Sequence, residues 1–352
     1  MRVLMLTQKV DRHDDILGFT HDWITALAGR VAALAVVALA VGEHDLPPNV
    51  TVHSMGKERG RGQIGLLAGF DRGVLRYMAE ADAVFVHMIP RYALLAAPVA
   101  AAHRKPMTLW FTHRSASLEL RLAIPLVRHI ATAHPSSFPL PGPKVHALGH
   151  GIDTRKFAPG EAPPGEPPIV ASLGRLSPIK RHETLIRAAA LLRDRHGDRP
   201  GRCVSAGGCR ADGPSGSEVG LRAEIDRLRV GDRVTLWGAV PAEGVTAVFH
   251  QASVAVNFSP PGLFDKAVLE AMLCAVPTVV ANPAFDELLG EYSEALRIEA
   301  GDDAAGLAAR LQALLALSPQ ERRTVGLQLR QRAAASHSLD GLMDRLVALL
   351  AS

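Results

Sequence analysis

The feature that most constrains this chain of 352 residues is a regular alternation of short β-rich runs with longer helical patterns. The first half has β-rich runs at residues 2–7, 36–39, 51–54, 83–87, 108–112, 130–133 and 145–147, and helical patterns at 19–33, 65–80 and 92–103. Strands that alternate with helices predict parallel sheets with helices on both faces. The predicted fold class is therefore α/β, with doubly wound parallel sheets.

The alternation stops once, at residues 159–168, which read Pro-Gly-Glu-Ala-Pro-Pro-Gly-Glu-Pro-Pro. Such a composition is typical of a linker. Strands then resume at 169–174, 202–206, 234–237, 254–258 and 278–281, with helices at 182–196, 217–228, 246–251, 266–274, 303–315 and 319–350. Because the chain is too long for one ordinary core, we predict two domains, 1–158 and 169–334.

Composition narrows the class of protein. The formal net charge is +4 and the basic residues are dispersed, which argues against a nucleic-acid partner. Cys203, Cys209 and Cys274 have no metal-ligand spacing and predict reduced thiols. No signal peptide is evident and the apolar run 31–41 is too short to span a bilayer, so a cytoplasmic location is expected. No metal-ligand motif and no nucleophile-elbow motif occurs, and no metal or cofactor is expected.

The most informative local stretch runs from Gly262 to Val280. A Gly-led loop enters a predicted helix near Lys266, which carries Glu270 in its first turn and ends before a strand beginning at Pro277. A helix N-terminus offers free N–H groups to an anion, and a carboxylate accepts hydrogen bonds from vicinal hydroxyls. Phosphate and ribose together indicate a nucleotide. The alternative is an exposed glutamate that the helix dipole favours.

A second constellation directly follows the predicted strand 169–174. Arg175 and Lys180 flank a Ser-Pro turn, where two cations suit a diphosphate. By itself this segment also fits a solvated basic loop. Together with Glu270 in the same domain, it favours a diphosphate site.

The first half contributes weaker candidates. His113 and His87 stand at predicted strand ends, where a histidine binds a sugar or phosphate or packs structurally. Gly18 lies between the first strand and first helix, where backbone approaches a ligand closely. Nearby polar and aromatic side chains offer contacts to a hydroxyl-rich acceptor, although a polar loop and helix cap is the alternative; they are Asp14, Asp15, His21, Asp22 and Trp23. The turn Gly149-His150-Gly151-Ile152-Asp153 is either a domain-crossing turn or a substrate-lining segment.

These residues resemble a known family. Gly174-Arg175-Leu176, Lys180, Glu270-Ala-Met and Pro277-Thr-Val-Val resemble the "glycosyl transferases group 1" domain of retaining, nucleotide-sugar-dependent glycosyltransferases of the GT-B fold. The turn at 149–153, followed by Phe157, resembles the family's Asn-Gly-Val-Asp…Phe segment. The resemblance is strong over about 170–282 and implies two Rossmann-like domains that face a cleft.

The resemblance also implies roles. Arg175 and Lys180, after Gly174, would hold the donor diphosphate, and Glu270 the donor ribose. Asp265, Lys266 and Ala267 would form the loop whose amides reach the donor, with Gly18 at the first loop and His113 near the transferred sugar. Asp15, His21, Trp23 and His150 would face the acceptor. In this fold the last helix, about 335–352, commonly packs back on the first domain.

The sequence departs from the family pattern at three places. Gly262 replaces the first glutamate of the Glu-x7-Glu motif, the first loop lacks a Gly-Gly pair, and His150 replaces the common asparagine. A nucleotide-sugar 2-epimerase and a non-catalytic nucleotide-sugar-binding relative remain alternatives. Related enzymes often use carbohydrate or lipid-linked acceptors, which implies peripheral membrane contact. A basic face of Arg30, Arg59, Arg61 and Arg72 would suit it, and a solvated surface is the alternative.

Overall fold

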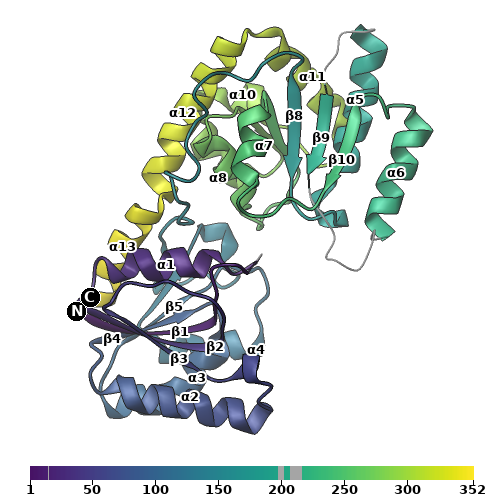
Figure 1. Cartoon of the computed structure of the whole chain (residues 1–352). Helices are drawn as coiled ribbons and strands as arrows, with labels where there is room; N and C mark the ends of the chain where they lie inside the picture. Colours follow the sequence, from purple (N-terminus) through teal and green to yellow (C-terminus); the bar gives the residue numbers. More distant parts are fainter. Residues whose placement is uncertain (15, 197–201, 207–215) are drawn as a thin grey trace. The chain divides into compact units, whose positions relative to one another are not determined.

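The computed structural model describes residues 1–14, 16–196, 202–206 and 216–352. They form two compact units, one of residues 1–151 with 336–352 and one of residues 152–335. Each unit is built around a wholly parallel sheet, as drawn in Figure 1. The predicted α/β class with two Rossmann-like domains is confirmed.

The first unit holds a seven-stranded sheet in the order β3-β2-β1-β4-β5-β6-β7. Its strands are β1 (Arg2–Val10), β2 (Ala33–Val41), β3 (Val50–Ser54), β4 (Ala83–His87), β5 (Met107–Trp110), β6 (His129–Thr132) and β7 (Val145–Ala147). Its helices are α1 (Phe19–Ala28), α2 (Gln63–Met78), α3 (Pro90–Ala102), α4 (Leu118–Ala123) and α13 (Leu339–Ala351), with short 3₁₀ turns at Lys57–Arg59, Ile124–Leu126 and Pro135–Ser137.

Two separate hydrophobic cores cover the two faces of this sheet. One core packs α1 and α13 on the sheet through residues such as Trp23, Leu27 and Leu342. The other packs α2, α3 and α4 on the opposite face through residues such as Phe70 and Leu120. Strand residues alternate between the cores, as the period of a strand requires: Met5 belongs to the first core and Leu6 to the second.

The second unit holds a five-stranded sheet in the order β10-β9-β8-β11-β12. Its strands are β8 (Ile169–Leu173), β9 (Arg202–Ala206), β10 (Val234–Gly238), β11 (Val254–Asn257) and β12 (Thr278–Val280). Its helices are α5 (Glu183–His196), α6 (Gly216–Leu228), α7 (Val245–Gln251), α8 (Lys266–Leu273), α9 (Asp286–Leu289), α10 (Ser293–Leu296), α11 (Ala304–Ala316) and α12 (Pro319–His337). Short 3₁₀ turns lie at Pro178–Lys180, Pro283–Phe285 and Gly290–Tyr292.

Several elements differ from the sequence expectation, among them α9 and α10, which were not predicted. The helix predicted at 19–33 ends at Ala28, and the Ala-rich run that follows belongs to β2. The short helix α4 was not predicted; Ser117 caps it by accepting a hydrogen bond from the Leu120 amide at 3.2 Å. The closing helix is two helices, because Ser338 leaves the helical conformation and accepts a hydrogen bond from the Gly341 amide, which starts α13.

Candidate functional site

In the second unit, the chain reverses its strand order between β8 and β11, which are hydrogen-bonded neighbours. Ligands of open α/β sheets bind at the carboxyl ends of strands, at such a switch point. The loop after β8 carries Arg175 and Lys180, and the loop after β11 carries Ser259 and Asp265. The topology therefore brings the two predicted constellations together.

Arg175 is exposed at the tip of the first loop, and a buried histidine shapes the turn beneath it. The Nε2 atom of His182 lies 3.2 Å from the carbonyl oxygen of Arg175, and its Nδ1 atom lies 3.2 Å from the hydroxyl of Ser172. A carbonyl only accepts, so Nε2 carries the proton and Nδ1 accepts from Ser172. Burial lowers the pKa of His182, which favours this neutral form. Sequence analysis placed His182 only at a helix start and missed this positioning role.

Lys180 and Asp265 form an ion pair whose side chains are only 12% and 14% exposed. The Asp265 carboxylate also accepts hydrogen bonds from Asn257 at 2.8 Å and Ser259 at 2.9 Å. Burial would raise the pKa of Asp265, but the charge of Lys180 and these donors outweigh it and hold the pKa below its usual range. The Asp265 carboxylate is therefore ionised near neutral pH.

Asp265 is also the N-cap of α8, since its second oxygen accepts from the Ala267 amide at 3.4 Å. Lys266 is the first residue of the helix. The expected donor-binding amide of Ala267 is therefore already paired within the chain. A ligand that used it would have to displace the cap.

Glu270 lies in the second turn of α8, not in the first as predicted, and it is partly buried rather than exposed. Burial raises the pKa of Glu270 to about 7, and the nearby negative charge of Asp265 adds to this effect. The positive charges of Lys266 and Lys156 lower the pKa and offset part of the increase. The raised pKa brings the titration of this carboxyl group close to neutral pH. A ligand that donates hydrogen bonds to it would favour the ionised form.

The position of α8 is fixed from its far end. The guanidinium of Arg330, on α12, donates to the carbonyl of Leu273, to that of Phe157 at 2.8 Å and to that of Thr154 at 3.2 Å. The cation therefore sits where the helix dipole favours positive charge. It ties the helix that carries Glu270 to the segment that carries Lys156.

The turn that precedes α8 requires a backbone conformation at position 262 that favours glycine. The Leu263 amide donates to the Pro260 carbonyl at 3.1 Å, and Gly262, in the third position of this turn, has a φ of 83°. Proline in the second position and a positive φ in the third define a type II turn. Glycine is therefore favoured here by the backbone alone.

The candidates of the first unit lie in different surroundings. His113 is exposed beyond β5, and its Nδ1 accepts a hydrogen bond from the Ser115 amide at 3.0 Å. Gly18 caps α1, and a Cβ there would lie 2.6 Å from the Asp14 carbonyl oxygen, so packing also demands glycine. His21 accepts a hydrogen bond from the Asp45 amide at 3.2 Å. Asp15 lies outside the described residues.

Two of the residues predicted to contact the acceptor, Trp23 and His150, have buried side chains. Trp23 is 2% exposed and packs edge-to-face on Trp110, with ring centroids 4.9 Å apart. His150 is 7% exposed, and its amide donates to His337 at 3.1 Å. The turn around it lies under the C-terminal segment, since a Cβ at Gly151 would come within 2.4 Å of Leu342.

Two of the four arginines expected to form a basic face (Arg30, Arg59, Arg61 and Arg72) make ion pairs within the chain. Arg30 donates to Asp344 at 2.6 Å and to Asp340 at 3.0 Å, which holds α13 on α1. Arg59 pairs with Glu58 at 3.3 Å. Arg30 is thus part of the packing of the last helix.

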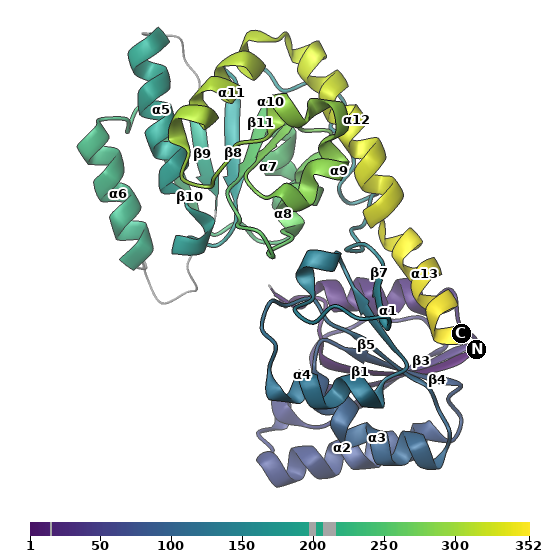
Figure 2. The ribbon, with the colours of Figure 1, turned by 180° about the vertical axis from the view of Figure 1, so that it is seen from behind.

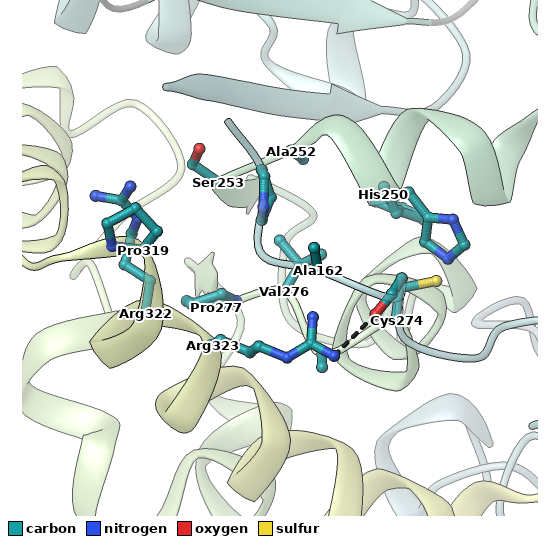
Figure 3. Close-up of a pocket in the computed structure, with 14 residues that line it drawn as sticks. Ala162, His250, Ala252, Ser253, Cys274, Val276, Pro277, Pro319, Arg322 and Arg323 are labelled. Carbon is teal, nitrogen blue, oxygen red and sulfur yellow. Dashed lines mark hydrogen bonds between the residues drawn. The ribbon is translucent and has the colours of Figure 1, made fainter. Parts of the chain in front are cut away.

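A small cavity of the second unit lies between the linker, the end of α7 and the start of α12 (Figure 3). It measures about 20 Å³ and is lined by residues that include Ala162, His250, Cys274 and Arg323, whose guanidinium donates to the Gly160 carbonyl at 2.8 Å. That volume holds about one water molecule. It is too small for a nucleotide.

A larger hollow of about 620 Å³ lies in the first unit beside the edge strand β3. It reaches the carboxyl ends of β2 and β3, at Val41 and Ser54. Its polar lining consists of His44, Asp45, Ser54, Glu58 and Arg59. Sequence analysis did not identify this hollow, although His21 binds the backbone of Asp45 at its rim.

Two absences hold for the residues that the structure describes. Within them, no cluster of three or more His, Cys, Asp or Glu residues is arranged to hold a metal ion. None of their helices is long and apolar enough to cross a membrane.

The relatives of this chain are glycosyltransferases by name. The D-inositol 3-phosphate glycosyltransferase of Nocardia farcinica is 30% identical over 232 residues, covering 59% of this chain and 48% of that protein. The protein of the same name from Segniliparus rotundus is 31% identical over 148 residues, covering 40% of this chain and 32% of that protein. The chain thus spans about half the length, or less, of these curated relatives.

Solved structures share the fold of the whole chain. Anabaena HepE, solved with UDP and glucose, superposes with a TM-score of 0.74 at 18% identity and covers 99% of both chains. Sucrose-phosphate synthase from Thermosynechococcus elongatus gives a TM-score of 0.73 at 16% identity, covering 99% of this chain and 98% of that one. Residues 167–317, which contain Arg175, Lys180 and Glu270, match the family "Glycosyl transferases group 1". This match lies within the second unit and covers less than half of the chain, so it is the second unit that resembles the glycosyl transferases group 1 family.

Proposed function

We propose that this chain is a glycosyltransferase that moves a sugar from a nucleoside diphosphate sugar to a hydroxyl-bearing acceptor. The observation that carries the proposal is the charged cluster at the carboxyl ends of β8 and β11. It contains the exposed Arg175, the Lys180–Asp265 ion pair, and Glu270, whose pKa the charge of Asp265 helps to raise. Cations beside a carboxylate with a raised pKa suit a diphosphate joined to a ribose.

In the proposed reaction Arg175 and Lys180 act on the leaving diphosphate. Negative charge develops there as the bond to the sugar breaks, and prepositioned cations stabilise it. Lys180 exchanges part of its contact with Asp265 for a phosphate oxygen. Glu270 accepts hydrogen bonds from the two ribose hydroxyls in its ionised form.

We propose retention of anomeric configuration and no requirement for a metal ion. Both follow the family resemblance, and the cations take the role that a metal would play at the diphosphate. UDP is the first nucleotide to test, because HepE was solved with UDP and with UDP-glucose. Inositol 3-phosphate is the first acceptor to test, because the curated relatives carry that name.

The acceptor is proposed to bind on the first unit. The hollow beside β3 offers two carboxylates, a hydroxyl, an imidazole and a guanidinium, which suit a ligand with several hydroxyl groups. His113, at another strand end of the same sheet, remains the proposed contact to the transferred sugar. Neither role depends on the buried Trp23 or His150.

The experiment is a thermal-shift screen with UDP, GDP, ADP and their sugars, followed by a transfer assay with the stabilising donor, with and without EDTA. A ligand that binds only the native state raises its melting temperature. We expect one base to stabilise the protein, Arg175→Ala to lose the shift, and transfer to retain configuration by NMR. Binding without transfer across a broad acceptor panel would instead identify a non-catalytic relative. Conversion of the donor sugar without any acceptor would identify a 2-epimerase.

A further inference from the structure

The strand β3, which ends the first sheet, has none of the features that usually protect a sheet edge from another chain. It reads Val50-Thr51-Val52-His53-Ser54 and contains no proline, lysine or carboxylate. Its register with β2 runs without a bulge from Val50 to Ser54. A regular edge strand rich in β-branched residues is a template for pairing with a further strand.

The other three edge strands of the two described sheets differ from β3. β7 and β12 have three residues each, and a bridge between Val280 and Arg297 pairs part of β12. β10 has five residues, but its register shifts between Leu236 and Gly238. Short strands and irregular register discourage pairing with another chain, so β3 is the edge that best suits it.

Alternate residues of β3 direct their backbone groups away from the sheet. The Met55 amide donates to the Ala38 carbonyl at 2.8 Å, so Met55 and the other odd-numbered residues of this segment face β2. Val50, Val52 and Ser54 therefore face outward, and the Val50 amide bonds within the preceding turn. The amides of Val52 and Ser54 and the carbonyls of all three residues point to where a further strand would lie.

The charges on the two flanks of β3 have opposite signs. Residues 42–49, before the strand, contain two exposed acidic residues and no Lys or Arg, and residues 55–62, after it, contain three exposed basic residues and one acidic residue. The acidic flank carries Glu43 and Asp45, and the basic flank carries Lys57, Arg59 and Arg61. Antiparallel pairing places the start of one strand beside the end of the other. The acidic flank of one copy of this chain would therefore meet the basic flank of a second copy, twice about one twofold axis.

The helices of the first unit cover the faces of its sheet and not this edge. α1 and α13 lie on one face and α2, α3 and α4 on the other, as both views show (Figures 1 and 2). Val50 and Val52 line the hollow of about 620 Å³ beside β3, and their side chains pack on the α1 face. A further strand in the plane of the sheet would thus wall this hollow without filling it.

We propose that two copies of this chain associate through β3, in antiparallel pairing about a twofold axis at Val52. Val52 of each copy exchanges both backbone hydrogen bonds with the other, and the Ser54 amide of each donates to the Val50 carbonyl of the other. Five paired residues bury less surface than the roughly 1,200 Å² of a stable interface, so we expect a dimer that dissociates on dilution. The inference does not depend on the proposed reaction, because its test is the oligomeric state of the chain.

The test is sedimentation velocity of the full chain over a dilution series. We expect a reversible dimer that Val52→Pro abolishes, because proline lacks the outward N–H and its ring obstructs a second strand. The Val52 N–H takes no part in the ladder with β2, so this variant should melt within a few degrees of the wild type. Thr51→Pro is the matched control for the geometry. Its N–H faces β2, so it should lower the melting temperature clearly.

A charge exchange tests the partner. Glu43→Lys/Asp45→Lys makes both flanks basic and Lys57→Glu/Arg61→Glu makes both acidic, so each variant alone should dimerise about tenfold more weakly. An equimolar mixture of the two should recover the dimer, which damage to the fold could not do. Asp226→Lys, at an exposed position of α6 beside the edge strand β10, is the charge control and should dimerise like the wild type. A chain that stays monomeric throughout the series, a dimer that the proline variant leaves intact, or a mixture that dimerises no better than its components would overturn the proposal.

Discussion

The ammonium group of Lys180 is hydrogen-bonded to the carboxylate of Asp265, so the cation that follows β8 is neutralised by the residue that caps α8. The pair is mostly buried, whereas Arg175, five residues earlier, is exposed. Arg175 therefore presents its cation at the surface of the first loop, whereas a ligand would have to share Lys180 with Asp265. This difference leads to separate predictions for the three residues.

Arg175→Ala and Lys180→Ala should each lower kcat/KM by about 100-fold or more, because each removes a cation that stabilises the leaving diphosphate. Arg187→Ala is the matched control, since Arg187 is an exposed arginine of the same unit that pairs with Glu224 at 3.0 Å. Steady-state kinetics with the donor found by thermal shift measures the effect. Near-wild-type turnover in both site variants would falsify the assignment.

Asp265→Ala should destabilise the protein by about 3 kcal/mol, because it leaves Lys180 without its counter-charge in a mostly buried position. Asp303→Ala is the control, since Asp303 caps α11 by accepting from the Gly306 amide at 2.7 Å. Loss of a cap alone costs about 1 kcal/mol. Urea unfolding should separate the two variants, and equal losses would mean that Asp265 acts only as a cap.

Much of the fold can be predicted from the sequence, because buried parallel strands are short apolar runs between helical patterns. β4 and β7 have the predicted bounds. The end of α1 was misplaced because an Ala-rich run suits a helix as well as a buried strand. The short α4 was missed because six residues give little periodicity.

The site was only partly predictable. Arg175, Lys180 and Glu270 stand in recognisable local patterns, and the structure places them in one unit, on the segments that follow β8 and β11. The Lys180–Asp265 contact joins residues 85 positions apart, which no local pattern reveals. The burial of Trp23 and His150 depends on α13, from the other end of the chain.

Glu270→Gln should make stability less dependent on pH. The pKa of Glu270 is raised from 4.5 to about 7 in the folded chain, so the native state holds a proton that the unfolded chain releases. Stability from this group is present below about pH 4.5 and is lost as the pH rises through 7. Relative to the wild type, the Gln variant should gain up to about 3 kcal/mol at pH 8 and less at pH 5.

The same variant should lose donor affinity, because a neutral amide accepts ribose hydroxyl hydrogen bonds less well than a carboxylate. Urea unfolding at pH 5 and pH 8, with donor titrations at both, measures the two effects. A parallel pH profile in variant and wild type would exclude Glu270 as the titrating group.

Arg330→Met should destabilise the protein by about 2 kcal/mol or more, because it removes a charged donor from three backbone carbonyls. The control is Arg323→Met on the same helix, which removes a single hydrogen bond, to the Gly160 carbonyl. It should cost less than half as much. Thermal unfolding compares the two variants, and similar losses would show that the bonds to α8 and to Phe157 add nothing to the stability of the unit.

Gly262→Ala and Gly262→Glu should lose the same stability, about 1 to 2 kcal/mol, because the positive φ of 83° and not the missing carboxylate selects glycine. Gly262→Asn should lose less, since asparagine tolerates this conformation better than other side chains. Equilibrium unfolding of the three variants gives the comparison. If glutamate proved much less destabilising than alanine, a favourable contact of the carboxylate with the cations of the loop would have to offset the backbone strain.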